Sequence, residues 1–233
     1  MPNNLFARTE MLLGAEALEK LKNSKILVFG VGGVGGYVCE ALARCGVGEI
    51  DVVDKDTVDE TNINRQIIAD TTNIGMPKVD AVKERMQRIN PEIKVNVFKT
   101  FFLPENADFV DFSNYDYIVD AVDTVSAKIE IVKRAKENSV PVISAMGTGN
   151  KINPQMLEVA DIQKTSVCPL AKAVRLLCRK NGIKHLKTVY SKEIPIKKEE
   201  NGRTPGSISF VPSSAGLLMA SEIVKDITGI RND

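Results

Sequence analysis

The sequence predicts an α/β fold: a Rossmann-like, mostly parallel sheet with helices on both faces. Short apolar runs of strand length alternate with segments of helical periodicity between residues 25 and 145. Connections of a dozen residues or more between such runs require parallel strands. The first apolar run also leads into GVGGVGG (residues 30–36), which is typical of the turn between a strand and a phosphate-binding helix.

Apolar periodicity assigns an element to most of the chain. In the first part we expect helices at 9–22, 33–45, 77–89 and 124–138, and strands at 25–29, 50–53, 93–98, 117–121 and 141–145. After residue 150 we expect helices at 166–181 and 213–228, with strands at 186–191 and in SISFVP (207–212). These later elements complete a single domain over residues 1–233, with an N-terminal half of about 1–150 and a C-terminal half of about 151–233.

Bulk composition favours a cytoplasmic protein. The net charge is +1 over 233 residues, so we expect no long-range electrostatic attraction of the whole chain to nucleic acid or membrane. The N-terminal stretch is amphipathic and charged, unlike a signal sequence, and no apolar run approaches the length of a membrane helix. The four cysteines form no CxxC pair, so we expect no zinc site.

The glycine-rich turn predicts nucleotide binding. Gly30, Gly32 and Gly35 follow the GxGxxG spacing, and Asp54 ends the next apolar run 19 positions after Gly35. Glycines let the backbone approach a phosphate at a helix N-terminus, while an acid at this spacing can bind ribose hydroxyls. A purely structural alternative is that the glycines only allow the helix to pack on the strand.

A long polar connection, residues 54–78, favours ATP over a dinucleotide. It contains Asn62, Asn64, Arg65 and Gln66 and leads into Lys78. Arg65 and Lys78 are two cations at the carboxyl edge of the predicted sheet, where Asp123 follows the run at 118–122. Two cations and an acid able to hold Mg²⁺ suit a triphosphate. A nicotinamide dehydrogenase and a surface charge cluster are the alternatives.

Four motifs in this order, GVGGVGG, DKDTVDETNINRQ, GMPK and DAVDT, resemble the ThiF/MoeB/HesA superfamily of ubiquitin-activating-type adenylyltransferases. The resemblance covers residues 6 to about 150. It implies a homodimer with a Mg²⁺–ATP site, in which a substrate carboxylate attacks the α-phosphate to give an acyl-adenylate and pyrophosphate.

The resemblance also implies the roles of individual residues. Residues of the glycine turn would lie along the phosphates, Asp54 would hold the ribose, and further residues of the polar connection would bind the nucleotide; this set is Gly30, Gly32, Gly33, Asp54, Asp56, Asn62, Arg65, Gln66 and Lys78. Asp123 would bind or orient Mg²⁺. Arg8 resembles an N-terminal arginine that reaches the partner subunit's ATP site, where it would act with Arg65, Lys78 and Asp123 in catalysis.

Motifs in the C-terminal half indicate one subfamily within this superfamily. VADIQKTSVCPLAKAVRLLCRK and GSISFVPSSAGLLMASEIVKDI are similar to the tRNA threonylcarbamoyladenosine dehydratase subfamily. This resemblance implies that ATP activates the threonyl carboxylate of the modified adenosine next to the anticodon. A neighbouring urea atom would then close a ring and expel AMP, so no thioester cysteine would be required. A bound monovalent cation and a sulfur-transfer partner protein remain open.

A basic segment supports tRNA as the substrate. Residues 172–203 contain Lys172, Arg175, Arg179, Lys180, Lys184, Lys187, Lys192, Lys197, Lys198 and Arg203. Only Glu193, Glu199 and Glu200 oppose them, a bias typical of phosphate contacts. A merely solvated charged face is the alternative. The single histidine, His185, lies within the segment, where we expect a surface position without a catalytic role.

Two other functions remain as alternatives. The motifs are shared with adenylyltransferases that activate the carboxyl terminus of a ubiquitin-like sulfur-carrier protein, although those usually contain paired CxxC motifs. The second is a non-catalytic nucleotide-binding protein, which would not need Arg8, Arg65, Lys78 and Asp123 together. Cys168 lies where the superfamily can form a thioester or persulfide, but we expect it to have no catalytic role.

Overall fold

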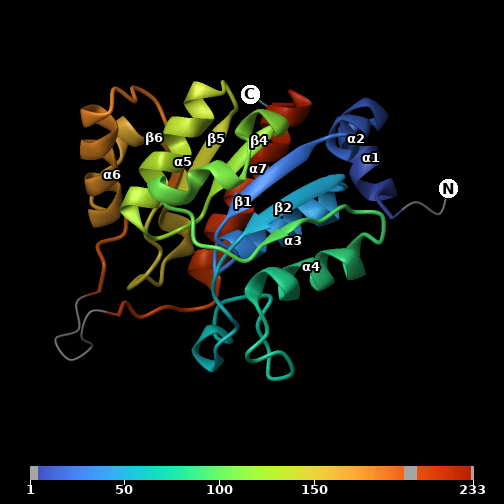
Figure 1. The fold of residues 1–233 in the computed structure, drawn as a ribbon, viewed down its shortest axis with the longest axis horizontal. Helices are drawn as coiled ribbons and strands as arrows, with labels where there is room; N and C mark the ends of the chain where they lie inside the picture. The colour runs from blue at the N-terminus through green and yellow to red at the C-terminus, as the bar shows by residue number, and fades with distance from the viewer. Residues whose placement is uncertain (1–4, 197–203, 232–233) are drawn as a thin grey trace.

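A computed structural model describes residues 5–196 and 204–231. One seven-stranded sheet runs through the molecule in the order β3-β2-β1-β4-β5-β7-β6 (Figure 1). All neighbouring strands are parallel except β6 and β7, which are antiparallel. The strands are β1 (Lys25–Phe29), β2 (Glu49–Val53), β3 (Val97–Phe98), β4 (Tyr117–Asp120), β5 (Val142–Ala145), β6 (Leu157–Asp161) and β7 (Lys187–Ser191).

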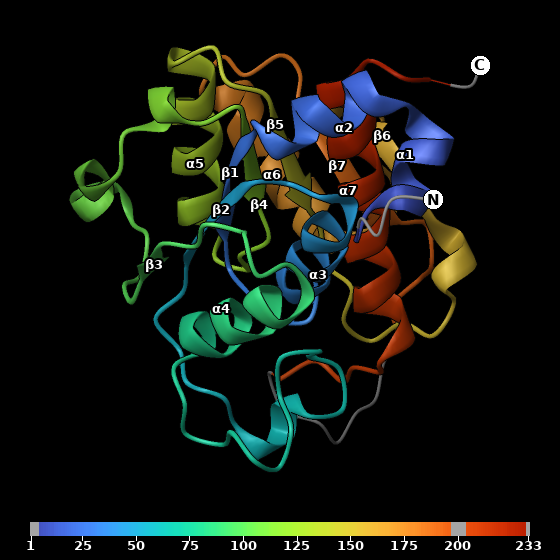
Figure 2. The same ribbon diagram turned by 90° about the vertical axis from the view of Figure 1, so that its right-hand side faces the viewer.

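Helices cover both faces of this sheet, as the sequence predicts (Figure 2). On one face α3 packs on α4 and α7, and α2 packs on α7. On the other face α5 packs on α6. The helices are α1 (Ala7–Leu13), α2 (Ala15–Lys22), α3 (Gly35–Cys45), α4 (Lys78–Ile89), α5 (Val125–Glu137), α6 (Pro169–Lys180) and α7 (Phe210–Thr228).

The two helical layers bury separate apolar clusters against the sheet. Strand residues alternate between them, because successive side chains point to opposite faces. In β1, Ile26 and Val28 belong to the cluster under α3 and α7, whereas Leu27 and Phe29 belong to the cluster under α5 and α6. The β1 core is therefore buried on both faces, which explains why its sequence is a continuous apolar run.

The strand order places a topological switch between β1 and β4. The connection after β1 leads to α3 on one face, and the connection after β4 leads to α5 on the other. Loops that leave adjacent strands in opposite directions open a crevice at the carboxyl ends, where ligands bind in such sheets.

The N-terminal helix differs from the sequence prediction. The expected helix at 9–22 is two helices, α1 and α2, separated at Gly14, whose φ is +84°. This left-handed backbone is accessible to glycine and interrupts the helical hydrogen-bond pattern. Apolar periodicity continues across Gly14, so the interruption was not visible in the pattern.

The predicted strand in SISFVP is wrong. Phe210 begins α7, and Pro212 lies in its first turn, where its missing N–H removes no helical hydrogen bond. Val211, Ala215 and Met219 are buried at helical spacing. The helical spacing of buried residues in α7 therefore begins at Val211. The sequence indicated a strand there because aromatic and β-branched residues are common in strands.

Three other boundaries differ from the expected ones. β6 (Leu157–Asp161) was missed, because this edge strand is only partly buried and lacks a clear alternating pattern. The strand expected at 93–98 pairs regularly only at Val97–Phe98, with an isolated bridge between Glu49 and Lys94. The helix expected from residue 166 begins at Pro169.

Candidate nucleotide site at the carboxyl edge of the sheet

The predicted nucleotide-binding residues line one cavity of about 520 Å³ at the carboxyl edge of the sheet. Its volume lies within the range of ordinary ligand pockets, roughly 300–1,000 Å³. Segments after β1, β2 and β4 form it together with the start of α4. The lining includes Gly30, Gly32, Gly33, Asp54, Asp56, Asn62, Arg65, Gln66, Lys78 and Asp123.

Two positions in the glycine turn need glycine because other backbone atoms lie very close to them. Gly30 has φ +81°, and a Cβ there would lie 2.8 Å from the carbonyl oxygen of Ala121. A Cβ on Gly35 would lie 1.8 Å from the Gly30 carbonyl oxygen. Gly32 has no such backbone neighbour, since its nearest contact is the Gln66 side chain at 3.7 Å. Gly30 and Gly35 thus form the turn, and Gly32 borders the open cavity.

Asp54 joins this turn to the next loop. One of its carboxylate oxygens accepts a hydrogen bond from the Val31 N–H at 2.9 Å, and the other accepts one from the Asp56 N–H at 2.9 Å. Each carboxylate oxygen has further lone pairs available. Asp54 therefore holds the turn in place and can still accept hydrogen bonds from the hydroxyls of a ribose.

The polar connection is folded by its own side chains. Asn62 is buried and accepts a hydrogen bond from the Asp59 N–H at 3.1 Å, while Asp59 caps the Thr61 N–H. The Lys78 side chain is 8% exposed, and its Nζ lies 3.0 Å from Asp56 Oδ2. Asp56 consequently neutralises Lys78 and positions its ammonium in the cavity wall.

Arg65 and Gln66 have unused hydrogen-bonding capacity. The Arg65 guanidinium donates to the Thr61 carbonyl at 2.7 Å and to Asn64 Oδ1 at 2.9 Å. It forms no ion pair with any carboxylate that the structure describes. Gln66 is buried, and its Oε1 lacks a hydrogen-bond partner, which is unusual for a buried polar atom. The Arg65 guanidinium therefore suits an anionic group of a ligand, and Gln66 Oε1 suits a hydrogen-bond donor such as a hydroxyl or an amino group.

A buried ion pair supports the segment that contains Asp123. Lys128 and Asp120 are both fully buried, with Nζ 3.1 Å from each carboxylate oxygen. Lys128 also donates to the Ala145 carbonyl at 2.7 Å, and Ser144 donates to Asp120. These contacts join β4, β5 and α5 directly below residues 121–124, which line the cavity.

The donor set fits magnesium only together with a phosphate ligand. Asp123 is exposed at the cavity, and no group of three or more His, Cys, Asp or Glu able to hold a metal occurs in the described residues. Mg²⁺ commonly takes one or two carboxylates and completes its coordination with phosphate oxygens and water. Asp123 can supply one such carboxylate.

Sequence reasoning missed part of the cavity wall. Phe101 and Thr148 also line the cavity, together with Ser207 from the C-terminal half. Phe101 lies beneath Lys55, whose Nζ is 4.4 Å from the ring centroid. The loop around Phe101 has no periodicity or motif. Ser207 approaches through a hydrogen bond from Asn64 to its carbonyl at 3.1 Å, which only tertiary structure creates.

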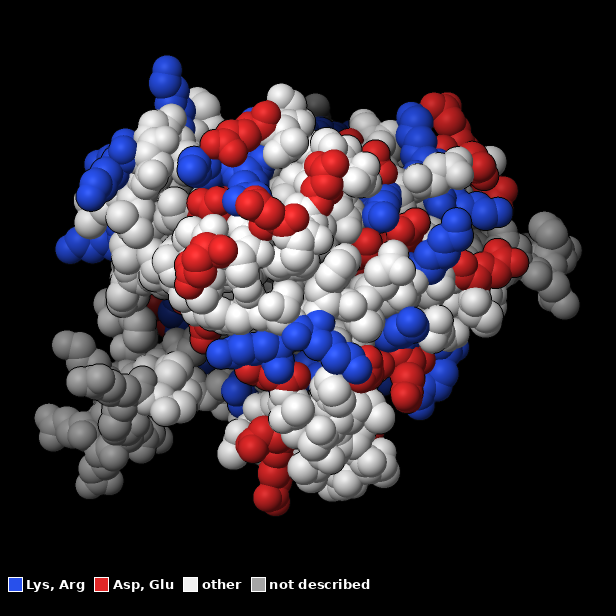
Figure 3. All heavy atoms as spheres, in the orientation of Figure 1, with Lys and Arg blue, Asp and Glu red and all other residues white. Residues whose placement is uncertain are grey.

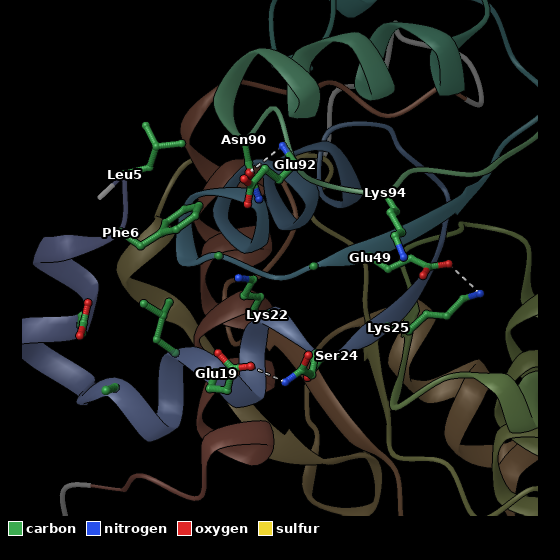
Figure 4. Close-up of a pocket in the computed structure, with 16 residues that line it drawn as sticks. Leu5, Phe6, Glu19, Lys22, Ser24, Lys25, Glu49, Asn90, Glu92 and Lys94 are labelled. Carbon is green, nitrogen blue, oxygen red and sulfur yellow. Dashed lines mark hydrogen bonds and ion pairs between the residues drawn. The ribbon is translucent and has the colours of Figure 1, made fainter. Parts of the chain in front are cut away.

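Arg8 does not line this cavity. It is exposed on α1, which lies with α2 near the amino ends of the strands. A second cavity of about 830 Å³ occurs there, between Phe6, Lys22, Glu49 and neighbouring residues (Figure 4). Its lysines and glutamates come from several elements, and two of them, Lys25 and Glu49, pair at 2.8 Å. Arg8 is therefore separated from the nucleotide site of its own chain.

The four cysteines are buried or partly buried, whereas the single histidine is exposed. Cys39, Cys168 and Cys178 are buried, and Cys45 is partly buried. Lys151, which the sequence did not single out, is also buried: its ammonium donates to the Gly147 carbonyl at 2.7 Å, and burial lowers its pKa. His185 lies on the surface, as expected, with Nδ1 3.2 Å from Asp161 Oδ2.

The basic segment is not one uniform surface. Lys187 pairs with Asp226 at 2.6 Å and with Glu222 at 3.3 Å, and Lys192 pairs with Glu158. Lys197, Lys198 and Arg203, with Glu199 and Glu200, lie outside the described residues. Glu193 is buried and accepts hydrogen bonds from the Ile152 and Asn153 N–H groups.

A glycine turn, an acid at the end of the next strand and two cations at a switch point are typical of a nucleotide-binding α/β protein. The sequence profile of the ThiF family matches residues 6–233. The chain therefore belongs to the ThiF family. Within the described residues, no helix is both long and apolar enough to span a membrane.

Relatives cover nearly the whole chain. It is 44% identical to the tRNA threonylcarbamoyladenosine dehydratase of Bacillus subtilis over 95% of this chain and 94% of that protein. The E. coli tRNA N6-threonylcarbamoyladenosine dehydratase TcdA, solved in complex with AMP, superposes with a TM-score of 0.90 at 33% identity, covering 96% of this chain and 94% of TcdA. TcdA has also been solved with ATP.

A different activity occurs in another relative. The adenylyltransferase and sulfurtransferase UBA4 of Vanderwaltozyma polyspora is 39% identical over 59% of this chain, a match that spans 31% of UBA4. The shared segment is shorter than the match to the dehydratases.

Proposed function

We propose that this chain is an ATP-dependent tRNA-modifying dehydratase that adenylates and cyclises N6-threonylcarbamoyladenosine next to the anticodon. The observation that carries the proposal is the 44% identity to a protein of this activity across 95% of the chain. All the residues proposed to bind ATP line one cavity, apart from Arg8. Residues 1–233 act as one domain in this proposal, since both halves contribute to the cavity.

The cavity suggests how ATP is held. The backbone after Gly30 faces the phosphates, and Asp54 accepts hydrogen bonds from the ribose. Arg65 supplies an unpaired guanidinium for the phosphate charge, and Lys78 adds an ammonium once ATP phosphates compete with Asp56. Mg²⁺, when bound through Asp123 and phosphate oxygens, would neutralise the charge on the triphosphate.

The reaction then needs no protein nucleophile. An oxygen of the threonyl carboxylate attacks the α-phosphorus of ATP, the bond to the β-phosphate oxygen breaks, and pyrophosphate leaves. A nitrogen or oxygen of the neighbouring urea attacks the activated carbonyl carbon, a urea N–H gives up its proton, and AMP is expelled as the ring closes. The carboxylate is already ionised at neutral pH, and proximity within the substrate lowers the barrier to cyclisation.

A homodimer would complete the site. Arg8 lies on α1, away from the cavity of its own chain, so it can assist only at the site of a partner subunit. An arginine placed there would stabilise the charge that develops on the phosphates. Mixing an Arg8→Ala variant with an Arg65→Ala variant tests this arrangement, since mixed dimers would regain one active site.

The decisive experiment is mass analysis of nucleosides from tRNA that contains threonylcarbamoyladenosine, after incubation with protein, ATP and Mg²⁺. We expect loss of one water from the modified nucleoside, with AMP and pyrophosphate released in equal amounts. Unchanged nucleoside would overturn the proposal. Repeating the reaction in sodium and potassium salts, with and without a cysteine desulfurase, tests the two accessory features: a monovalent cation and a sulfur-transfer partner.

The second candidate is activation of a ubiquitin-like sulfur-carrier protein. The match to UBA4 favours it, because that relative combines adenylyltransferase and sulfurtransferase activities. The absence of CxxC pairs in the sequence argues against it. AMP formation that depends on a carrier with a free C-terminal carboxylate, and not on tRNA, would support this candidate. Either activity belongs in the cytoplasm.

A further inference from the structure

Helix α6 presents a basic surface without acidic residues. Residues 162–192 contain eight lysines and arginines and no Asp or Glu. Lys187 and Lys192 are engaged with acidic side chains from elsewhere in the chain. The other six form no ion pair with a described residue; we call them the basic α6 surface: Lys164, Lys172, Arg175, Arg179, Lys180 and Lys184.

Four of these side chains belong to α6 itself, and Lys164 and Lys184 lie before and after it. Lys172 and Arg179 are exposed and lie seven positions apart, which places them on the same helical ridge. Ala171, Val174 and Cys178 are buried on the opposite side. Figure 3 shows Lys and Arg atoms, without Asp or Glu atoms beside them, at the left margin of the molecule over α6.

Two of the arginines are held in defined positions. The Arg175 guanidinium donates to the Thr165 carbonyl at 2.8 Å and to its hydroxyl at 2.6 Å. The Arg179 Nε donates to Gln163 Oε1 at 2.8 Å. Both retain free N–H donors, because a guanidinium has five. Neutral partners orient these groups without neutralising them, so less side-chain entropy is lost when an anion binds.

The basic α6 surface begins beside the nucleotide cavity. A Cβ built on Gly147 would lie 3.7 Å from Cys168 Sγ and 3.7 Å from Leu170 Cβ. Thr148, the next residue, lines the cavity. The 12 residues of α6 extend about 18 Å from this point. A polyanion that reaches the cavity can therefore continue along the helix.

We propose that the basic α6 surface binds backbone phosphates of the tRNA whose modified nucleoside enters the cavity. The inference rests on the proposed function and adds the surface by which the substrate is held. Dispersed cations of one sign along a helix suit a phosphate chain. A lipid surface fits less well, since membrane-bound helices need an apolar face beside the basic one, and Leu176 is the only large apolar residue exposed along Lys172–Lys180.

The test compares two triple variants with the same change in net charge. The α6 variant combines Lys172→Ala, Arg179→Ala and Lys184→Ala and leaves the hydrogen bonds of Arg175 to Thr165 intact. The control combines Lys20→Ala, Arg44→Ala and Arg88→Ala, three cations outside α6 that each pair with a glutamate four positions earlier on their own helix. Binding of the modified tRNA, its KM for cyclisation and ATP affinity are measured for both, at several salt concentrations.

We expect tRNA affinity of the α6 variant to fall by at least about tenfold, with the slope of log K against log salt reduced by about two. ATP affinity and the cyclisation rate at saturating tRNA should remain within about twofold of wild type. The control should match wild type.

An equal loss of tRNA affinity in both variants, or no loss in the α6 variant, would overturn this inference. If the wild-type protein still cyclises the modified nucleoside, the proposed function would stand. Tighter wild-type binding to anionic vesicles than to tRNA would also overturn the inference. A wild-type protein that does not process tRNA would remove both proposals.

Discussion

The two edges of the sheet differ in how their charged side chains are paired. At the amino edge several charged groups are paired within the chain: Lys25 lies 2.8 Å from Glu49, and Tyr115 donates to Asp51 at 2.8 Å. Burial and the bond to Asp51 raise the pKa of Tyr115, so its hydroxyl remains a donor. Lys187 and Tyr117 likewise both contact Asp226.

At the carboxyl edge the charges that face the cavity are only partly satisfied. Arg65 has no carboxylate partner among the residues the structure describes, and Gln66 retains an unpaired buried oxygen. Lys78 pairs with Asp56, but Asp56 is itself exposed. Paired charges stabilise the fold, whereas unpaired ones at a crevice remain available to a ligand.

The buried pair under the carboxyl edge gives the largest expected effect. Lys128→Met leaves the fully buried Asp120 without its cation, and we expect the free energy of unfolding to fall by about 3–5 kcal/mol. Urea denaturation measures the change. Adding Asp120→Asn removes the isolated charge and should recover part of the loss. A single variant as stable as wild type would contradict the structural role of this pair.

Arg65 should affect activity instead of stability. Arg65→Ala removes a cation from the phosphate region, and we expect the rate of tRNA-dependent pyrophosphate release to fall by about 10²–10³-fold, or about 2.7–4 kcal/mol. The melting temperature should be unchanged, because the side chain pairs with no carboxylate. Arg88→Ala, which changes an exposed arginine on α4, is the control. Equal rates in the two variants would show that Arg65 does not contact the phosphates.

Asp226 should show the opposite behaviour. Asp226→Asn weakens the contacts to Lys187 and Tyr117, and we expect a loss of about 1–3 kcal/mol in unfolding free energy with unchanged activity of the folded protein. Chemical denaturation with parallel activity assays measures both. A loss of activity larger than the loss of folded protein would place a function at the amino edge.

The same residue predicts a dependence of stability on pH. Burial raises the pKa of Asp226, but hydrogen bonds from Lys187 and Tyr117 outweigh it and hold the pKa below its ordinary value of 3.8. The stabilisation is therefore complete above pH 3.8 and is lost as the pH falls through the lower, folded-state pKa. Between pH 5 and pH 2.5 the wild type should lose more stability than Asp226→Asn.

Cys168 gives the smallest expected effect. It is buried, and the proposed reaction uses no thiol, so Cys168→Ser should keep cyclisation within about twofold of wild type when compared per folded molecule. Cys178→Ser, at a second buried cysteine, controls for the cost of placing a hydroxyl in the core. Complete loss of cyclisation in Cys168→Ser alone would assign this thiol a catalytic role.

The residues that line the candidate nucleotide cavity could be predicted from the sequence because their signals are local. The glycine turn, Asp54, the polar connection and Asp123 each follow the end of a predicted strand, and parallel strands bring all those ends to one edge. The same logic predicted the helices on both faces. Periodicity failed where it is weak or misleading, at Gly14, in β6 and in the first turn of α7.

Which charged side chains stay unpaired depends on contacts that form only in the folded chain. Lys172 and Lys187 look equivalent in the basic segment, yet Lys187 meets Asp226 from α7 while Lys172 meets no carboxylate in the described chain. The burial of Lys128 against Asp120 and the distance of Arg8 from its own cavity likewise depend on contacts between remote segments. Pairing is a property of three-dimensional neighbours, so residue type and spacing alone could not determine it.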